Sequence, residues 1–196
     1  MRTVIEVGAN DGGNTRAFLD TPDTAVYCFE PTVELQLILQ QKFKKYENFH
    51  LIPAAVHIEN GFEYFNVAGT SDWGCSSLYE FSENLETIWP NRPDFHRTDR
   101  YKVMTLRLDT FFDLYNIGEV DYLWIDAQGS DFNVLKSLGS KISNIKQGKC
   151  EAAHQVELYK TKDNNAFEIK RYMEANGFDV WFEHPHQEVD VHFRKK

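Results

Sequence analysis

Short apolar runs separated by turn residues dominate the first quarter of the chain. Residues 3–7 are apolar and partly β-branched and end at Gly8, a pattern typical of a buried strand that enters a turn. Similar runs at 25–29 and 49–54 predict two more strands, and a helical segment is expected at 15–19. Strands that alternate with helices indicate a parallel sheet with helices on both faces.

A longer helix is expected between the second and third strands. It would run from Pro31 to about Tyr46, because proline is favoured in the first turn of a helix. Its apolar face would be formed by Val33, Leu35, Leu37 and Ile38.

Antiparallel structure is expected after the third strand. Runs at 56–59 and 62–67 flank Asn60-Gly61, a dipeptide that suits a type I′ turn. The pattern therefore predicts a β-hairpin inserted between the first three strands and the rest of the sheet.

The end of the chain carries a second antiparallel signal. Alternating runs at 178–183 and 188–193 predict a hairpin joined through His184-Pro185-His186. Together the elements predict a single doubly wound α/β domain over residues 1–196, with a mostly parallel, Rossmann-like sheet. The other predicted elements are strands at 101–108, 121–126 and 148–156 and helices at 110–115, 131–138 and 166–176.

Residues 69–100 interrupt this alternation with a long segment that contains several aromatic side chains and two prolines. A loop of this length is uncommon in a compact domain and usually serves as a lid or a binding loop. Its aromatic content argues against plain disorder. Two interpretations stay open: a lid over the substrate, or a static flap that covers one face of the sheet.

The composition is that of a globular protein with an acidic balance. Hydrophobic residues make up 42% of 196, and 30 Asp and Glu against 21 Lys and Arg give a net charge of −9. Nucleic acid is disfavoured as a partner, because phosphate binding needs a concentrated basic surface. No apolar run approaches the roughly 20 residues that span a bilayer, and no secretion signal precedes the first strand. We expect a cytoplasmic protein without a membrane partner.

The turn after the first strand has the character of a ligand-binding loop. Gly8 and Gly13 match the outer glycines of the dinucleotide fingerprint G-x-G-x-x-G, but Asn10 replaces the central one. Glu6 and Asp11 add negative charge that would repel a pyrophosphate. The turn therefore favours a cation-bearing ligand such as S-adenosylmethionine, which has a sulfonium, an ammonium and no phosphate.

Two carboxylates end predicted strands. Glu30 follows Gly8 by 22 residues, close to the spacing at which an acidic residue binds a ribose diol, although it could instead cap the next helix. Asp126 ends the strand at 121–126, facing the crevice where doubly wound folds bind ligands. Asp131 is the better candidate for a helix N-terminal residue.

Five segments of the chain resemble the FkbM family of methyltransferases. In order they are EVGANDGGNT, CFEP, IPAAV, TLRLDTFF and DYLWIDAQGSDFNVLKSL, and they span about Val4 to Leu138. The chain departs from the family at Trp124, where the family has Lys, and at Asp131, where it has Glu.

The resemblance implies a class I methyltransferase fold and S-adenosylmethionine-dependent O-methylation of a small-molecule acceptor, such as a sugar or a secondary metabolite. The turn after the first strand would meet the methionine part of the cofactor, Glu30 its ribose, and Ala54-Ala55-Val56 its adenine. Ser76-Ser77 resembles a serine-bearing segment of the family, or is a polar loop. The expected cofactor-binding residues are Glu6, Gly8, Asn10, Asp11, Glu30, Pro31, Ala55 and Asp126.

Methyl transfer to a hydroxyl gains from a positioned base. Asp126 is expected to orient the acceptor or the methionine end, and His154, on the neighbouring strand, to remove the proton, since its pKa is ordinarily near neutrality. His154 could instead be structural, and the base would then be Glu151 or Asp131. A divalent cation between Asp126 and Glu151 is a further alternative, although no metal is expected.

Two other classes of protein share the expected fold. A nicotinamide-dependent oxidoreductase would use the same ribose carboxylate, but Asn10 and the acidic turn count against it. A non-catalytic binding module would keep the fold without turnover. Trp124, which stands where the family has Lys, is compatible with this interpretation. Fold alone does not separate these classes.

Overall fold

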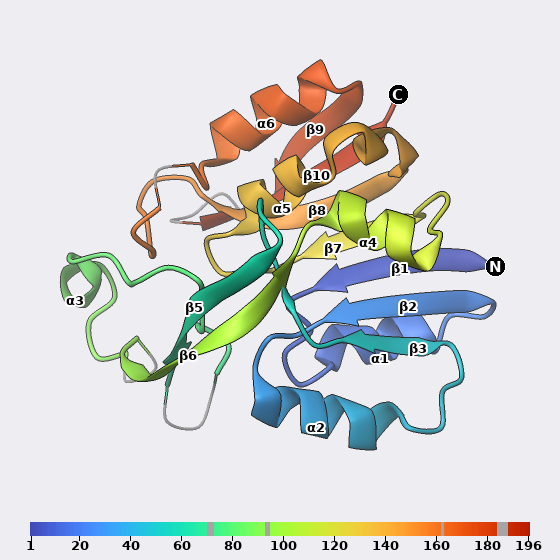
Figure 1. Ribbon diagram of the computed structural model, residues 1–196. Helices are drawn as coiled ribbons and strands as arrows, with labels where there is room; N and C mark the ends of the chain where they lie inside the picture. Colours follow the sequence, from blue (N-terminus) through green and yellow to red (C-terminus); the bar gives the residue numbers. More distant parts are fainter. Residues whose placement is uncertain (70–72, 93–94, 162, 184–187) are drawn as a thin grey trace.

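The computed structural model describes residues 1–69, 73–92, 95–161, 163–183 and 188–196. Seven of its strands form one sheet and three form a smaller sheet beside it (Figure 1). In chain order the elements are β1 (Arg2–Val7), α1 (Gly13–Leu19), β2 (Thr24–Phe29), α2 (Val33–Phe43), β3 (Phe49–Ile52), β4 (Ala55–Val56), β5 (Gly61–Ala68), α3 (Leu85–Ile88), β6 (Arg97–Leu106), α4 (Leu108–Tyr115), β7 (Tyr122–Ile125), α5 (Asp131–Ser137), the 3₁₀ helix η1 (Gly139–Asn144), β8 (Gln147–Ala153), α6 (Ala166–Ala175), β9 (Phe178–Glu183) and β10 (Glu188–Lys195).

The large sheet has the strand order β3-β2-β1-β7-β8-β10-β9. All pairs from β3 to β8 are parallel, and β10 is antiparallel to both of its neighbours. The doubly wound sheet and its antiparallel C-terminal hairpin are therefore confirmed, with the last strand inserted between β8 and β9. The expected hairpin connection His184-Pro185-His186 lies outside the described residues. From β1 the strand order runs outward through β2 and β3 on one side, and through β7 and β8 on the other. Such a switch point between β1 and β7 is where open α/β sheets bind ligands.

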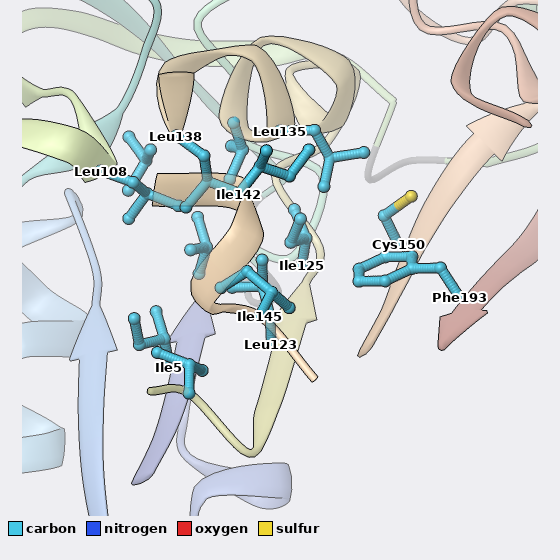
Figure 2. Close-up of a cluster of buried hydrophobic side chains, with 14 of the residues drawn as sticks. Ile5, Leu108, Leu123, Ile125, Leu135, Leu138, Ile142, Ile145, Cys150 and Phe193 are labelled. Carbon is cyan, nitrogen blue, oxygen red and sulfur yellow. The ribbon is translucent and has the colours of Figure 1, made fainter. Parts of the chain in front are cut away.

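Helices cover both faces of this sheet, as predicted. On one face, Ile5, Leu123 and Ile125 are fully or almost fully buried, and Figure 2 shows them in one cluster with Leu108 and Leu135. Each such side chain contributes roughly 1.5–3 kcal/mol through burial. On the other face, α1 and α2 close a second cluster against β1 and β2.

The burial of α2 differs from the expectation. The helix begins at Val33, two residues after Pro31, and the exposed fractions of Val33 and Leu37 are 53% and 63%. The buried stripe consists of Leu35, Leu39 and Phe43, spaced four residues apart. Leu37 lies about 200° round the helix from Leu35, because each residue advances about 100°. The expected apolar face was therefore wrong for Val33, Leu37 and Ile38, the last of which is 42% exposed.

The inserted antiparallel pair is present, but its partners differ from the prediction. β5 pairs with β6, which lies between β4 and β5 in the small sheet. The side chain of Asn60 is used elsewhere: its Oδ1 accepts from the backbone N of Arg107 at 2.8 Å, and its Nδ2 donates to Thr110 Oγ1 at 2.9 Å. Asn60-Gly61 is thus part of a loop tied to the start of α4 and is not a hairpin turn.

The described part of the segment at 69–100 contains α3 and the first residues of β6. Its aromatic side chains, including Tyr79 and Phe81, pack with Leu158 and Tyr159 from the stretch after β8. Within the described ranges, no helix is both long and apolar enough to cross a membrane.

Candidate functional site

A pocket with about 590 Å³ of empty space, part of it open to solvent, lies at the carboxyl ends of β1, β2 and β7. The pocket is at the switch point of the sheet, where the sequence predicted the binding crevice. Its remaining walls come from the start of α2, the β3–β4 connection and residues 73–78.

The turn after β1 is shaped by close backbone contact. Gly8 has a φ of 83°, and a Cβ added to it would lie 1.9 Å from the carbonyl oxygen of Asp126. Its backbone N donates to the carbonyl of Phe29 at 3.0 Å. Asn10 also has a positive φ, 50°, which asparagine tolerates better than most residues. Glycine is therefore required where β1, β2 and β7 meet.

Glu30 is the most firmly held carboxylate of the pocket. Its side chain is 4% exposed and accepts hydrogen bonds from the backbone N of Asn10 at 2.9 Å and of Thr32 at 2.7 Å. Burial raises the pKa of Glu30 to about 7, against the lowering effect of these bonds. Each carboxylate oxygen can accept a further hydrogen bond, so the group is suited to a pair of ligand hydroxyls.

Asp126 follows β7 and faces the same pocket. Its Oδ1 accepts a hydrogen bond from Nε2 of Gln128 at 2.5 Å. Burial raises the pKa of Asp126, while the bond from Gln128 and the nearby Lys149 ammonium lower it. The backbone carbonyl of Asp126 lies against Gly8, so the strand that ends in Asp126 is in contact with the turn after β1.

The pocket lining combines apolar and acidic side chains. Its apolar members include Leu35, Ala55, Phe65, Trp73 and Leu78. Its charged members are the two carboxylates, and the described lining residues include no Lys, Arg or His.

Ser130, a buried polar residue, also lines the pocket. An adenine ring, a ribose diol and a cationic amino acid would match the apolar side chains, Glu30 and Asp126 in chemistry. A pyrophosphate would meet two carboxylates and no basic group.

Six of the predicted cofactor-binding residues line the pocket, and two do not. The six are Gly8, Asn10, Glu30, Pro31, Ala55 and Asp126. Glu6 is fully buried beneath the turn, where its Oε2 accepts from Thr15 Oγ1 at 2.6 Å and from Cys28 Sγ at 3.2 Å. Asp11 points outward to Lys42, 3.3 Å away.

The expected bases lie outside the pocket lining. The ring of His154 packs against Phe167 and Phe182, with centroids 5.5 and 6.3 Å apart. Burial and neighbouring carboxylates, Asp126 first, raise the pKa of Glu151 to about 9, so it carries a proton at neutral pH. The catalytic role of His154 stays a prediction that its position does not support. No group of three or more metal-ligating side chains occurs among the described residues.

Several pocket residues were not predicted from the sequence. Gln128 and Ser130 stand within four residues of Asp126, so their place after a functional strand was a usable signal. Trp73, Gly74 and Leu78 come from the irregular segment, and nothing in the local pattern showed which of its residues face the pocket.

The strand order and the pocket define the fold class as that of the class I, Rossmann-like methyltransferases. A precorrin-6y C5,15-methyltransferase from Geobacter metallireducens GS-15 superposes with a TM-score of 0.52 at 11% identity, covering 100% of this chain and 81% of that one. Fibrillarin from Aeropyrum pernix, with natively bound S-adenosyl-L-methionine, gives 0.52 at 12% identity, covering 98% and 65%. Similarities at this level of identity establish the fold.

The family is established by the sequence match. The model of the methyltransferase FkbM domain matches residues 6–180, and the chain belongs to this family. The 2-O-methyltransferase NoeI of Sinorhizobium fredii (strain NBRC 101917 / NGR234) is 26% identical over 138 residues, which cover 67% of this chain and 55% of NoeI. The chain thus spans about half the length of this curated relative. The chain thus carries an FkbM methyltransferase domain whose cofactor is S-adenosylmethionine, which decides against the nicotinamide-dependent alternative.

Proposed function

We propose that the chain methylates a hydroxyl group of a small-molecule acceptor and holds its cofactor in the pocket at the ends of β1, β2 and β7. The observation that carries this proposal is the chemistry of the pocket lining, which combines apolar side chains with the carboxylates of Glu30 and Asp126 and, among the described lining residues, includes no basic group. The bound cofactor supplies an activated methyl group. The chain's own residues bind the cofactor, orient it and exclude water.

Each kind of lining residue has a defined task in this proposal. Glu30, held by two backbone N–H groups, accepts the ribose hydroxyls. Asp126 faces the cationic methionine end, where its negative charge is favourable. Ala55, Phe65 and Trp73 provide the apolar walls for the adenine.

The acceptor is proposed to be a hydroxyl compound, with carbohydrate as the first candidate. The similarity to a 2-O-methyltransferase supports transfer to oxygen. The net charge of −9 supports a small acceptor over a nucleic acid. The three cysteines are an odd number and do not form the framework of a disulfide-rich protein, which supports a reducing compartment, and we propose the cytoplasm.

The cofactor site is tested by replacing its ribose carboxylate. Glu30→Ala should weaken the binding of S-adenosylhomocysteine at least roughly tenfold, because hydrogen bonds to charged groups contribute about 1.5–3 kcal/mol. Calorimetric titration measures the change, and Glu34→Ala, at an exposed glutamate in the first turn of α2, is the matched control. Unchanged affinity in Glu30→Ala would remove Glu30 from the ribose site.

The acceptor is tested by transfer of a labelled methyl group from S-adenosylmethionine. We expect label on saccharides with free hydroxyls and none on RNA. Label on RNA or on amines alone would overturn the proposed acceptor while leaving the cofactor site in place.

A further inference from the structure

The turn after β7 places Gln128 between Asp126 and Tyr159. Gln128 and Gly129 have successive positive φ values of 48° and 88°. A Cβ added to Gly129 would lie 2.8 Å from the ring of Tyr159, so this ring rests directly on the turn. The backbone conformation therefore brings the Gln128 side chain against both neighbours.

The hydrogen bonds of Gln128 give its amide one orientation. Nε2 donates to Asp126 Oδ1 at 2.5 Å, and Oε1 accepts from the hydroxyl of Tyr159 at 2.5 Å. Tyr159 is 3% exposed, and burial raises the pKa of its phenol well above the ordinary value, so it keeps its proton and can donate. An amide turned by 180° would set its oxygen against the Asp126 carboxylate, which is unfavourable while Asp126 is ionised.

The same residues hold the segment that closes the pocket. Ser77 Oγ donates to the carbonyl of Gln128 at 2.6 Å, and the Tyr159 hydroxyl lies 3.0 Å from the carbonyl of Cys75. Gly74 and Ser76, the residues on either side of Cys75, line the pocket. The position of Gln128 is thus coupled to the pocket wall as well as to Asp126.

We propose that Gln128 is a positioning residue that keeps Asp126 turned toward the cationic end of the cofactor, and that Tyr159 orients the Gln128 amide for this task. The proposal rests on the proposed role of Asp126 in the cofactor site. Gln128 acts through Asp126, and Tyr159 acts through Gln128.

Asp126 lies in a strongly acidic environment, so its orientation and charge depend on few favourable contacts. Lys149 on β8 is the cation that favours its ionised form. Acids face it from β1, β2, α5, β8 and β10, and the Tyr159 phenol lies beside them. These acids are Glu6, Glu30, Asp131, Glu151, Glu188 and Asp190.

Two substitutions of Gln128 should change cofactor binding in opposite directions with pH. Gln128→Met removes the donor, so Asp126 takes up a proton more readily, and S-adenosylhomocysteine affinity should fall roughly tenfold at pH 6 and less at pH 8.5. In Gln128→Glu, a protonated carboxyl donates to Asp126 as the amide does, but ionisation sets two carboxylates together. Its affinity should be near wild type at pH 6 and lower at pH 8.5.

Tyr159→Phe tests the orienting step. It keeps the ring on Gly129 and removes the hydroxyl, so it should show the same pH trend as Gln128→Met with a smaller change. Each variant is compared with wild type at the same pH by calorimetry, so the titration of the ligand itself cancels. Gln41→Met, at an exposed glutamine of α2, and Tyr115→Phe, at an exposed tyrosine of α4, are the matched controls.

The outcomes separate this proposal from the proposed function. Failure of the wild type to bind S-adenosylhomocysteine would overturn the proposed site itself. Wild-type binding with the same affinity loss at both pH values, or with no loss, in both Gln128 variants would overturn the positioning role. Opposite pH trends with unchanged thermal unfolding midpoints support it.

Discussion

At the scale of single residues, Gly8 shows how closely the pocket floor is assembled. Its α-carbon faces the Asp126 carbonyl at a distance that leaves no space for a methyl group, and its φ lies in the left-handed region. The close contact and the left-handed φ both disfavour a Cβ atom at this position. The turn that we propose to bind the cofactor is therefore also a contact that holds β1 against β7.

Gly8→Ala should destabilise the domain and weaken cofactor binding together. Overpacking commonly costs about 1–3 kcal/mol, and the left-handed conformation adds to it, so we expect a loss of at least about 2 kcal/mol in the free energy of unfolding. Urea denaturation measures this loss. Gly118→Ala is the control, because a Cβ there would meet nothing within 4 Å, and an equal loss in both variants would contradict the steric argument.

At the scale of elements, the segment from Trp73 to Arg92 has two parts with different surroundings. Trp73, Gly74, Ser76 and Leu78 line the pocket. Residues around α3 pack with Leu158 and Tyr159, and Figure 1 shows α3 at the edge of the molecule, away from the large sheet. One part is therefore placed to respond to a ligand and the other to anchor the segment.

Hydrogen exchange should separate these two parts. Amides of residues 73–78 should become more protected when S-adenosylhomocysteine binds, because a closing wall excludes water. Amides of residues 85–89 should change little and serve as the internal control. Equal protection of both parts with and without ligand would show that the segment is a static cover.

At the scale of the whole molecule, buried acids link stability to pH. Burial raises the pKa of Glu6, Glu30, Asp131 and Glu188 to about 7, and that of Glu151 to about 9. In the unfolded chain these groups ionise at their ordinary, lower pKa values. The stability that they provide is therefore fully present only below those values and is lost as pH rises through the folded pKa values.

The free energy of unfolding of the ligand-free protein should thus fall between pH 5 and 8.5. Glu6→Gln should remove roughly 2 kcal/mol of this fall, because it abolishes one titration and keeps an acceptor for Thr15. Urea denaturation of both proteins at the two pH values provides the measurement. A parallel pH dependence in the variant would show that Glu6 does not titrate as the structure implies.

The sequence by itself determined the order of elements and the polar ends of the strands. Short β-branched runs, Gly8 and the helical segments between the runs are local signals, and local signals are sufficient for strands that are bounded by their own turns. Glu30 and Asp126 were found because each ends an apolar run, and the carboxyl ends of parallel strands meet at one edge of a sheet.

Only the tertiary structure decided which distant segments meet. The partner of β5, the buried stripe of α2 and the surroundings of His154 depend on pairing and packing that local periodicity does not encode. The hydrogen bond between Tyr159 and Gln128 joins residues 31 positions apart, and neither has a local pattern that requires it. The raised pKa values likewise follow from burial, which arises only when the whole chain has folded.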